Sequence, residues 1–279
     1  MTRGENNIFA QIGLLVEDSC MKITVCELPD DESSLRRAWD QLAQHVRHAG
    51  SDLVVLPEMP FAPWFAVAQT YDEGVWRGAV EQHERWLERL PDLGSATVIG
   101  TRPVTRGSRH LNEAFAWDAE SGYRTLHDKR YLPDEEGFWE AHWYAPGDGD
   151  FTPACLAATP TGVLVGVLIC TEQWSMAHAQ RYGKAGVHLI ATPRCTGRAT
   201  VDKWVTGGRA VAIVSGAYSV SSNRSAPTGN GDFGGGGWVI DPDGQVLALT
   251  TSDDPVRTVE IDLTAADAAK RTYPRYALD

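Results

Sequence analysis

Three polar side chains each come just after an apolar or turn segment, and together they could perform acyl transfer. Glu58 follows LVVLP, Lys129 lies in HDKRYLP, and Cys170 ends VGVLIC. A thiol needs a base to become a nucleophile, and the oxyanion of acyl transfer needs a positive or hydrogen-bond-donating group. A carboxylate, an amine and a thiol meet these needs. Taken singly, each has a plainer interpretation, because a cysteine that ends an apolar strand is usually packed and lone charged residues are usually solvated.

Expected strands and helices alternate along the chain. The strand candidates are 22–28, 52–58, 96–104, 113–118, 162–170, 188–193, 213–223, 236–242 and 257–263. Helical spacing occupies 32–49, 80–90, 175–185 and 200–212. This alternation predicts a layered α/β fold with some parallel pairing, in which near-continuous apolar strands are covered on both faces. Residues just past the carboxyl ends of such strands gather around the ligand site, so the three side chains should meet there.

Composition narrows the class of protein. The chain has 279 residues, 43% hydrophobic and 22% charged, which is typical of a globular protein, and we expect one domain. The formal net charge is -12, and no cluster of Lys and Arg would form a phosphate-binding stripe, so nucleic acid is not an expected partner. The sequence DPDG at 241–244 predicts a hairpin turn.

The beginning of the chain predicts neither a membrane anchor nor an export signal. The apolar segment 8–17 is too short to span a bilayer and contains Gln11 and Glu17. Because Met21 begins a clean strand pattern, residues 1–20 are expected to be an extension outside a domain that covers 21–279. The five cysteines are an odd number without CxxC spacing, which favours a reducing cytoplasm over a zinc site or a disulfide scaffold.

Several segments in order resemble the nitrilase superfamily of carbon-nitrogen hydrolases. These are LVVLPE at 53–58, HDK at 127–129, YAPGD at 144–148, VGVLICTE at 165–172, SSN at 221–223 and GGGWVIDPDGQVLA at 235–248. Each motif is weak alone, but their joint order covers nearly the whole chain from Met21. The resemblance implies an α/β fold in the form of a four-layer α-β-β-α sandwich.

The resemblance also implies a set of site residues and a mechanism. Glu58, Lys129 and Cys170 correspond to the family's Glu-Lys-Cys triad, and Glu140 to a second glutamate that orients the lysine. Cys170 would attack the substrate carbon, with Lys129 and the Thr171 backbone N–H holding the oxyanion. Water would then hydrolyse the thioester, and neither a metal nor an organic cofactor is expected.

Substrate contacts are expected in the segments that follow the catalytic strands. Aromatic walls from Trp64, Trp139, Trp143 and Trp174 suit an apolar or planar group, and Arg194 could pair with a substrate carboxylate or form a structural salt bridge. Glu172 could shape the site or stabilise the turn after the nucleophile. An acid two residues after the cysteine also occurs in branches that hydrolyse nitriles, so the family pattern leaves the substrate open.

Three functions therefore remain. The leading hypothesis is a hydrolase of a small amide or N-carbamoyl compound, the second is a nitrilase that releases an acid and ammonia, and the third is a catalytically silent binding or assembly module. The intact triad argues against the third. Relatives pair through helices near the nucleophile, so the resemblance implies a homodimer or higher homo-oligomer through the segments 175–186 and 200–212.

Overall fold

The computed structural model describes residues 19–156, 162–226 and 232–278. Its strands are β1 (Cys20–Pro29), β2 (Leu53–Val55), β3 (Thr97–Arg106), β4 (Arg109–Asp118), β5 (Gly122–Asp128), β6 (Ala154–Leu156), β7 (Val163–Val167), β8 (Leu189–Arg194), β9 (Tyr218–Ser225), β10 (Trp238–Ile240), β11 (Val246–Leu249) and β12 (Val256–Asp262). Its α-helices are α1 (Glu32–Ala49), α2 (Glu73–Leu87), α3 (Glu140–Trp143), α4 (Met176–Lys184), α5 (Val201–Ser215) and α6 (Leu263–Ala269).

The strands form two halves that meet at β1. Hydrogen bonding follows the order β5-β4-β3-β2-β1-β9-β8-β7-β6, with β12 on β1 and the hairpin β10–β11 on β9. The first part of β1 pairs with β2 and β12, whereas Glu27–Pro29 pairs in parallel with Asn223–Ser225 of β9. Because β1 changes partners along its length, one half can fold over the other.

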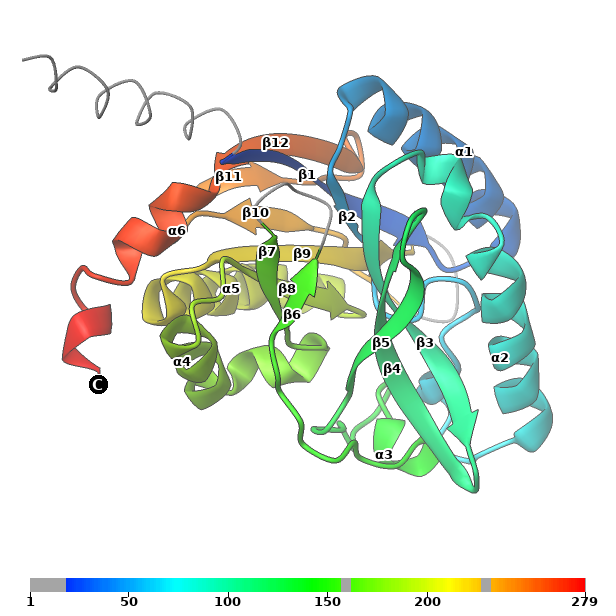
Figure 1. Ribbon diagram of the computed structural model, residues 1–279. Coiled ribbons are helices and arrows are strands. Elements are labelled where there is room, and N and C mark those ends of the chain that lie inside the picture. Colours follow the sequence, from blue (N-terminus) through cyan, green and yellow to red (C-terminus); the bar gives the residue numbers. More distant parts are fainter. Residues whose placement is uncertain (1–18, 157–161, 227–231, 279) are drawn as a thin grey trace, which may run out of the picture.

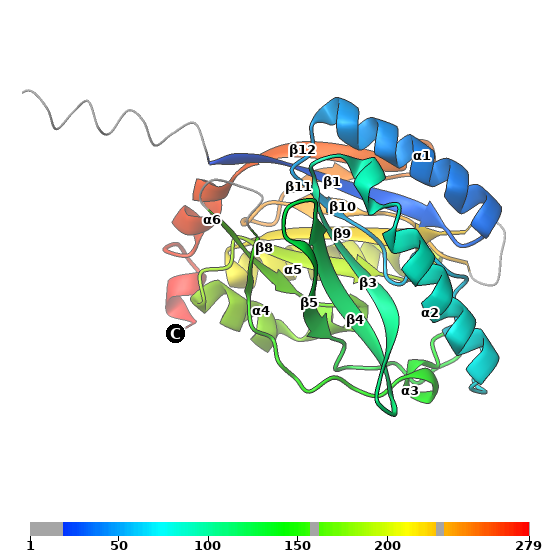
Figure 2. The same ribbon diagram turned by 45° about the vertical axis from the view of Figure 1, so that its right-hand side comes forward.

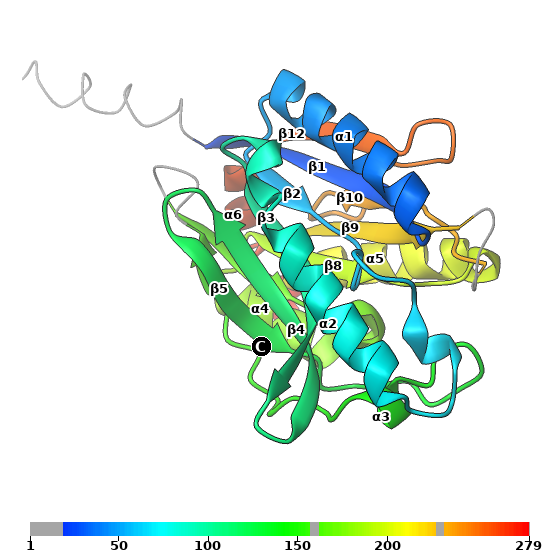
Figure 3. The ribbon, with the colours of Figure 1, turned by 90° about the vertical axis from the view of Figure 1, so that its right-hand side faces the viewer.

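Four layers result from this arrangement. The core between the two halves is built from residues such as Ile23 and Val55 on one side and Val165 and Val220 on the other. The helices α1 and α2 cover the outer face of β1–β5, as Figures 1 and 3 show, and α4 and α5 cover the outer face of β7–β9. The predicted α-β-β-α sandwich is confirmed.

Local sequence explains where the helices begin and end. In α1, the Asp31 side chain accepts a hydrogen bond from the Ser34 N–H, and Gly50 closes the helix with a left-handed φ of 63°. Apolar residues recur at helical spacing and face the sheet, namely Leu35, Trp39, Leu42, Ala43 and Val46. The segment 32–49 is therefore helical as predicted.

Predicted and observed boundaries differ most for two elements. The helix predicted at 80–90 begins earlier, at Glu73, because Asp72 caps it by accepting from the Val75 N–H. The strand predicted at 213–223 is wrong in its first part, because α5 continues to Ser215 and ends at Gly216, which has a φ of 66°. The hairpin predicted at 241–244 is present between β10 and β11.

The N-terminal extension predicted at 1–20 lies mostly outside the described residues, which begin at residue 19. Cys20 already belongs to β1, where it pairs with Asp262. Within the described ranges, no helix is both long and apolar enough to cross a membrane. The helices α4 and α5, which the resemblance assigns to a dimer interface, pack side by side in Figure 2, and their pairing with a second copy stays a prediction.

Candidate active site

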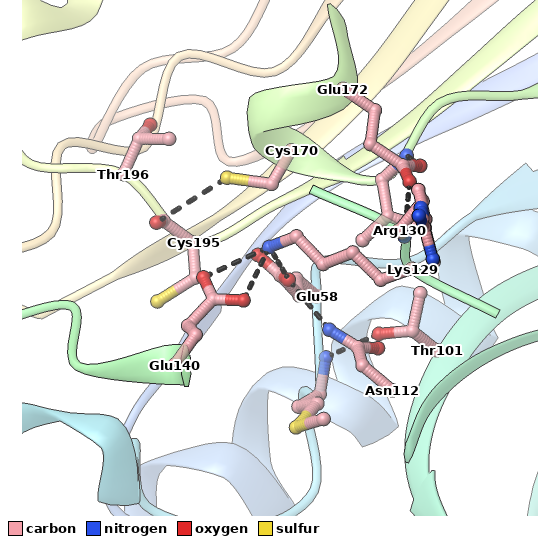
Figure 4. A network of polar contacts seen from close by, with 12 residues as sticks. Glu58, Thr101, Asn112, Lys129, Arg130, Glu140, Cys170, Glu172, Cys195 and Thr196 are labelled. Carbon is pink, nitrogen blue, oxygen red and sulfur yellow. Dashed lines mark hydrogen bonds and ion pairs between the residues drawn. The ribbon is translucent and has the colours of Figure 1, made fainter. Parts of the chain in front are cut away.

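The structure brings Glu58, Lys129 and Glu140 into direct contact. Glu58 lies three residues after β2, Lys129 directly follows β5, and Glu140 begins α3. The Lys129 ammonium donates to Glu58 Oε1 at 2.7 Å and to the two Glu140 oxygens at 2.9 and 2.6 Å (Figure 4). All three side chains are buried, so a cation sits between two carboxylates away from bulk water.

The backbone and side chain of Glu58 are held from several sides. Its N–H donates to the Arg194 carbonyl at 3.0 Å, and its carbonyl accepts from the Arg224 guanidinium at 3.0 Å. Asn112 Nδ2 donates to Oε1 at 2.8 Å, the same oxygen that Lys129 contacts. The buried second oxygen, Oε2, has no hydrogen-bond partner among the described residues and is thus available to accept a proton.

Cys170 adopts an unusual backbone conformation. It begins a 3-10 turn that covers Cys170–Trp174, three residues after β7, and its φ is 48°. Left-handed backbone is costly for a residue with a side chain and persists where surrounding structure enforces it, often at functional sites. The thiol lies 3.8 Å from the Cys195 carbonyl oxygen. The Thr171 N–H is at the start of the turn, where helical geometry leaves N–H groups free for a ligand.

Burial and the nearby carboxylates shape the protonation of the site. Burial, reinforced by Glu58, raises the pKa of the Cys170 thiol despite the opposing Lys129 charge, so the resting group is a thiol. Burial alone would lower the pKa of Lys129, but Glu140 and Glu58 outweigh it and raise that pKa well above its usual value. Burial raises the pKa of Glu140 to about 8, against the attraction of Lys129.

A cavity of about 480 Å³ opens onto Cys170. Its lining residues are Tyr131, Leu132, Pro133, Asp134, Glu135, Phe138, Glu140, Cys170, Thr171, Trp174, Cys195, Thr196, Gly197, Thr200, Lys203 and Trp204. Of the residues predicted to contact substrate, Trp174 lines this cavity and is 39% exposed. The predicted oxyanion donor, Thr171, also lines the cavity, so Trp174 and Thr171 both border the cavity onto which Cys170 opens.

Three predicted aromatic contacts do not line the cavity, and one of them is Trp139, whose ring centre lies 5.6 Å from that of His142. Trp64 and Trp143 do not line the cavity and are almost fully buried in a cluster around Phe65. The Trp64 indole donates to the Gly137 carbonyl at 3.0 Å, and the Trp143 indole donates to the Ala68 carbonyl at 2.6 Å. Their role is to pack the segment after Glu58, and the prediction of substrate contact does not hold for either.

Arg194 and Glu172 are also turned away from the cavity. The buried Arg194 guanidinium donates to Ser221, Thr196 and the Gly236 carbonyl, and Arg194 is not among the residues that line this cavity. The Glu172 carboxylate is fully buried and occupied by protein donors, which places it among structural groups. Neither the predicted carboxylate-binding arginine nor a direct substrate contact by Glu172 agrees with these positions.

Comparison with known proteins identifies the fold and the family together. A family model described as carbon-nitrogen hydrolase matches residues 22–271. The chain belongs to the carbon-nitrogen hydrolase family. It is 24% identical over 267 residues to an N-carbamoylputrescine amidase from Oryza sativa subsp. japonica, covering 84% of this chain and 82% of that one.

Solved structures agree in fold. A carbon-nitrogen hydrolase from Helicobacter pylori G27 matches with a TM-score of 0.80 at 20% identity, covering 92% of this chain and 94% of the other. A variant of the amidase from Nesterenkonia sp. AN1 matches with a TM-score of 0.72 at 18% identity, covering 94% and 97%, and carries a covalent acetamide addition at its active-site cysteine. The present chain is thus a carbon-nitrogen hydrolase with the nitrilase-superfamily fold.

Several residues of this carbon-nitrogen hydrolase site carry no clear signal in the sequence. Asn112 lies inside β4 and looks like an ordinary polar strand residue, and Lys203 and Trp204 lie on α5, far from the motifs. Thr196 reaches the cavity two residues after β8. The usable signal was a position just beyond a strand end, and it applied to the segment after β8, where Cys195, Thr196 and Gly197 line the cavity.

Proposed function

We propose that this carbon-nitrogen hydrolase cleaves a small amide or N-carbamoyl compound through an acyl intermediate on Cys170. The observation that carries the proposal is the buried Glu58-Lys129-Glu140 cluster beside a thiol that opens onto a cavity. The names of its curated relatives, which include a 2-oxoglutaramate amidase and omega-amidases, support an amide as the substrate.

Acylation begins from the neutral thiol. Glu58 takes the Cys170 proton through its unpartnered Oε2 as the sulfur attacks the carbonyl carbon, so that no free thiolate accumulates. The oxyanion lies between the Thr171 N–H and the Lys129 ammonium. Because the three ammonium contacts go to carboxylate oxygens, the oxyanion replaces one Glu140 oxygen as its charge develops.

The intermediate then collapses and is hydrolysed. The C–N bond breaks, and the leaving ammonia or amine takes the proton that Glu58 holds. A water molecule next gives a proton to Glu58 and attacks the acyl carbon, and Cys170 recovers a proton as the acid leaves. The covalent intermediate replaces one difficult step with two easier ones, using side chains present in the chain.

The cavity favours a small substrate with an apolar or planar part. Its volume of about 480 Å³ is at the lower end of typical small-molecule pockets, which span roughly 300–1,000 Å³. Aromatic rings from Phe138, Trp174 and Trp204 form part of the walls, and the ring centres of Trp174 and Trp204 lie 5.1 Å apart. Such walls bind a planar amide group or a short carbon chain.

A direct test compares wild type with Cys170→Ala on a panel of primary amides, N-carbamoyl amines and nitriles. We expect wild type to release ammonia from the first two classes and to show an acyl mass adduct after brief incubation, and Cys170→Ala to show neither. Cys155→Ala, which removes an exposed thiol that does not line the cavity, is the matched control and should behave as wild type. Turnover of nitriles alone would replace the proposal with a nitrilase, and equal activity in Cys170→Ala would overturn the nucleophile.

A further inference from the structure

The Glu172 carboxylate joins the two segments that carry the proposed catalytic lysine and cysteine. Its Oε1 accepts from the Arg130 N–H at 2.6 Å, and its Oε2 accepts from the Ile169 N–H at 2.8 Å. Arg130 directly follows Lys129, and Ile169 directly precedes Cys170. Figure 4 shows Glu172 reaching the backbone beside Lys129 from the turn that Cys170 begins.

His127 holds this carboxylate from the opposite side. Its Nε2 lies 3.0 and 2.9 Å from the two Glu172 oxygens, and its Nδ1 lies 2.7 Å from the Asp150 carbonyl oxygen. Both ring nitrogens thus face acceptors, and only the imidazolium form donates from both. Burial opposes the charge on His127, but Glu172 outweighs burial and raises the histidine pKa.

A purely local role accounts for only half of these contacts. An acid at the third position of a turn commonly reaches back to the backbone N–H before the turn, which explains the bond to Ile169. It does not explain the bond to Arg130, which lies 42 residues away on a different element of the fold. That second bond fixes one catalytic segment relative to the other.

We propose that Glu172, held in place by His127, is a positioning residue that sets the distance between the Lys129 ammonium and the Cys170 thiol. This role rests on Cys170 being the nucleophile. Glu172 touches neither the cavity nor the reacting atoms, so it acts through the backbone of its two neighbours. Misplacing a catalytic group by about 1 Å can cost about 100-fold in rate even where substrate binding is intact.

Glu172→Gln tests this role with minimal change in shape. Both carboxylate oxygens accept from backbone N–H groups, whereas the amide offers one acceptor and presents its NH₂ to the other N–H. We expect kcat for ammonia release to fall about 100-fold with KM changed by less than about threefold. The rate of Cys170 alkylation by iodoacetamide at fixed pH should fall as well, because it depends on the same cationic neighbour.

A second buried carboxylate provides the matched control. Glu27 is 5% exposed and accepts from the Gly236 N–H and the Thr250 hydroxyl, away from the cavity. Glu27→Gln should lower the melting temperature, as Glu172→Gln does. Its kcat should stay within about threefold of wild type, because the substitution does not move the reacting groups. His127→Asn should lower kcat less than Glu172→Gln, because Glu172 keeps both backbone bonds.

Two results would overturn the positioning role. One is a folded Glu172→Gln protein whose kcat and alkylation rate both match wild type, and the other is an equal loss of kcat in Glu27→Gln. If wild type released no ammonia from any amide, the proposed substrate class would fail separately. The alkylation rates of wild type and Glu172→Gln would still decide the positioning role.

Discussion

Replacing the buried lysine by a methionine should expose how strongly the charge cluster depends on its single cation. Lys129 Nζ contacts three carboxylate oxygens within 2.9 Å, and the side chains of Lys129, Glu58 and Glu140 are at most 1% exposed. Removing one partner of a buried ion pair costs about 3–5 kcal/mol, because it leaves uncompensated charge in a low-dielectric interior. We therefore expect Lys129→Met to lose about 3–5 kcal/mol of unfolding free energy near neutral pH.

The pH dependence of this loss has a definite sign. Burial already raises the pKa of Glu140 to about 8 with Lys129 present, and removing the ammonium raises it further. A carboxyl whose folded pKa lies above its unfolded pKa stabilises the fold at low pH and loses that contribution as pH rises. The difference in stability between Lys129→Met and wild type should thus stay nearly constant below about pH 8 and grow above it, where Glu140 ionises in wild type but stays protonated in the variant.

Urea unfolding at pH values below and above about 8, followed by circular dichroism, measures these quantities. Lys22→Met is the matched control, since the Lys22 ammonium donates to the neutral Ala49 carbonyl, and its loss should cost about 1 kcal/mol. The double variant Lys129→Met with Glu58→Gln should recover part of the stability because it removes the buried carboxylate that the single variant leaves without its cation. A loss below about 1 kcal/mol in Lys129→Met would refute the reasoning, because it would mean that the cation is not required to compensate the buried carboxylates.

Two further predictions concern the cavity and its protonation. Lys203 is the one cationic side chain among the described residues that line the cavity, and its ammonium lies 5.7 Å from the Trp174 ring centre, with no carboxylate of the described residues within ion-pair distance. Lys203→Met should therefore lower kcat/KM by about tenfold for amides that carry a carboxylate and leave kcat/KM for neutral amides unchanged. Steady-state ammonia release measures both values. The Glu140 pKa of about 8 predicts that kcat/KM falls above that pH, because an ionised Glu140 adds a negative charge beside the developing oxyanion. In a pH–rate profile, Glu140→Gln should lack this alkaline decline, whatever its activity at pH 7.

The triad could be predicted from the sequence because its positions follow from strand ends and motif order. Glu58 and Lys129 come within three residues of strands β2 and β5 in one half, and Cys170 comes within three residues of β7 in the other half. Residues just past strand ends gather around a ligand site, and packing of the two halves brings these together. Glu140 came only from resemblance, since nothing in FWEAHWY distinguishes a catalytic acid from a surface one. Its burial against Lys129 is a property of the assembled fold.

The boundaries of elements were less predictable than their type. The start of α2 depends on one capping hydrogen bond from the Val75 N–H to Asp72, which the apolar spacing of 80–90 does not register. The end of α5 depends on the left-handed Gly216, which sits inside a β-branched run that alone favours a strand. A side-chain cap sets the start of α2, and a left-handed glycine sets the end of α5.

Trp174 lines the cavity as predicted, and the other substrate-contact predictions failed for a common reason. Tryptophan and arginine beside a strand end are equally compatible with a cavity wall and with a packed support, and the sequence does not record which way they face. Arg194 illustrates this, because its guanidinium lies 4.0 Å from the Trp238 ring centre and its donors are taken by buried acceptors. Burial lowers the pKa of Arg194 to about 9.

Arg194 still bears on the cavity, but through a neighbour. Its Nη1 donates to the Thr196 hydroxyl at 2.8 Å, the Thr196 N–H donates to the Asn223 side chain at 2.9 Å, and Thr196 lines the cavity beside Cys195. The Cys195 carbonyl oxygen accepts a hydrogen bond from the Cys170 thiol at 3.8 Å. The segment after β8 is thus fixed by buried donors on one side while its other side meets the Cys170 thiol, so Arg194 supports a wall of the cavity instead of lining it.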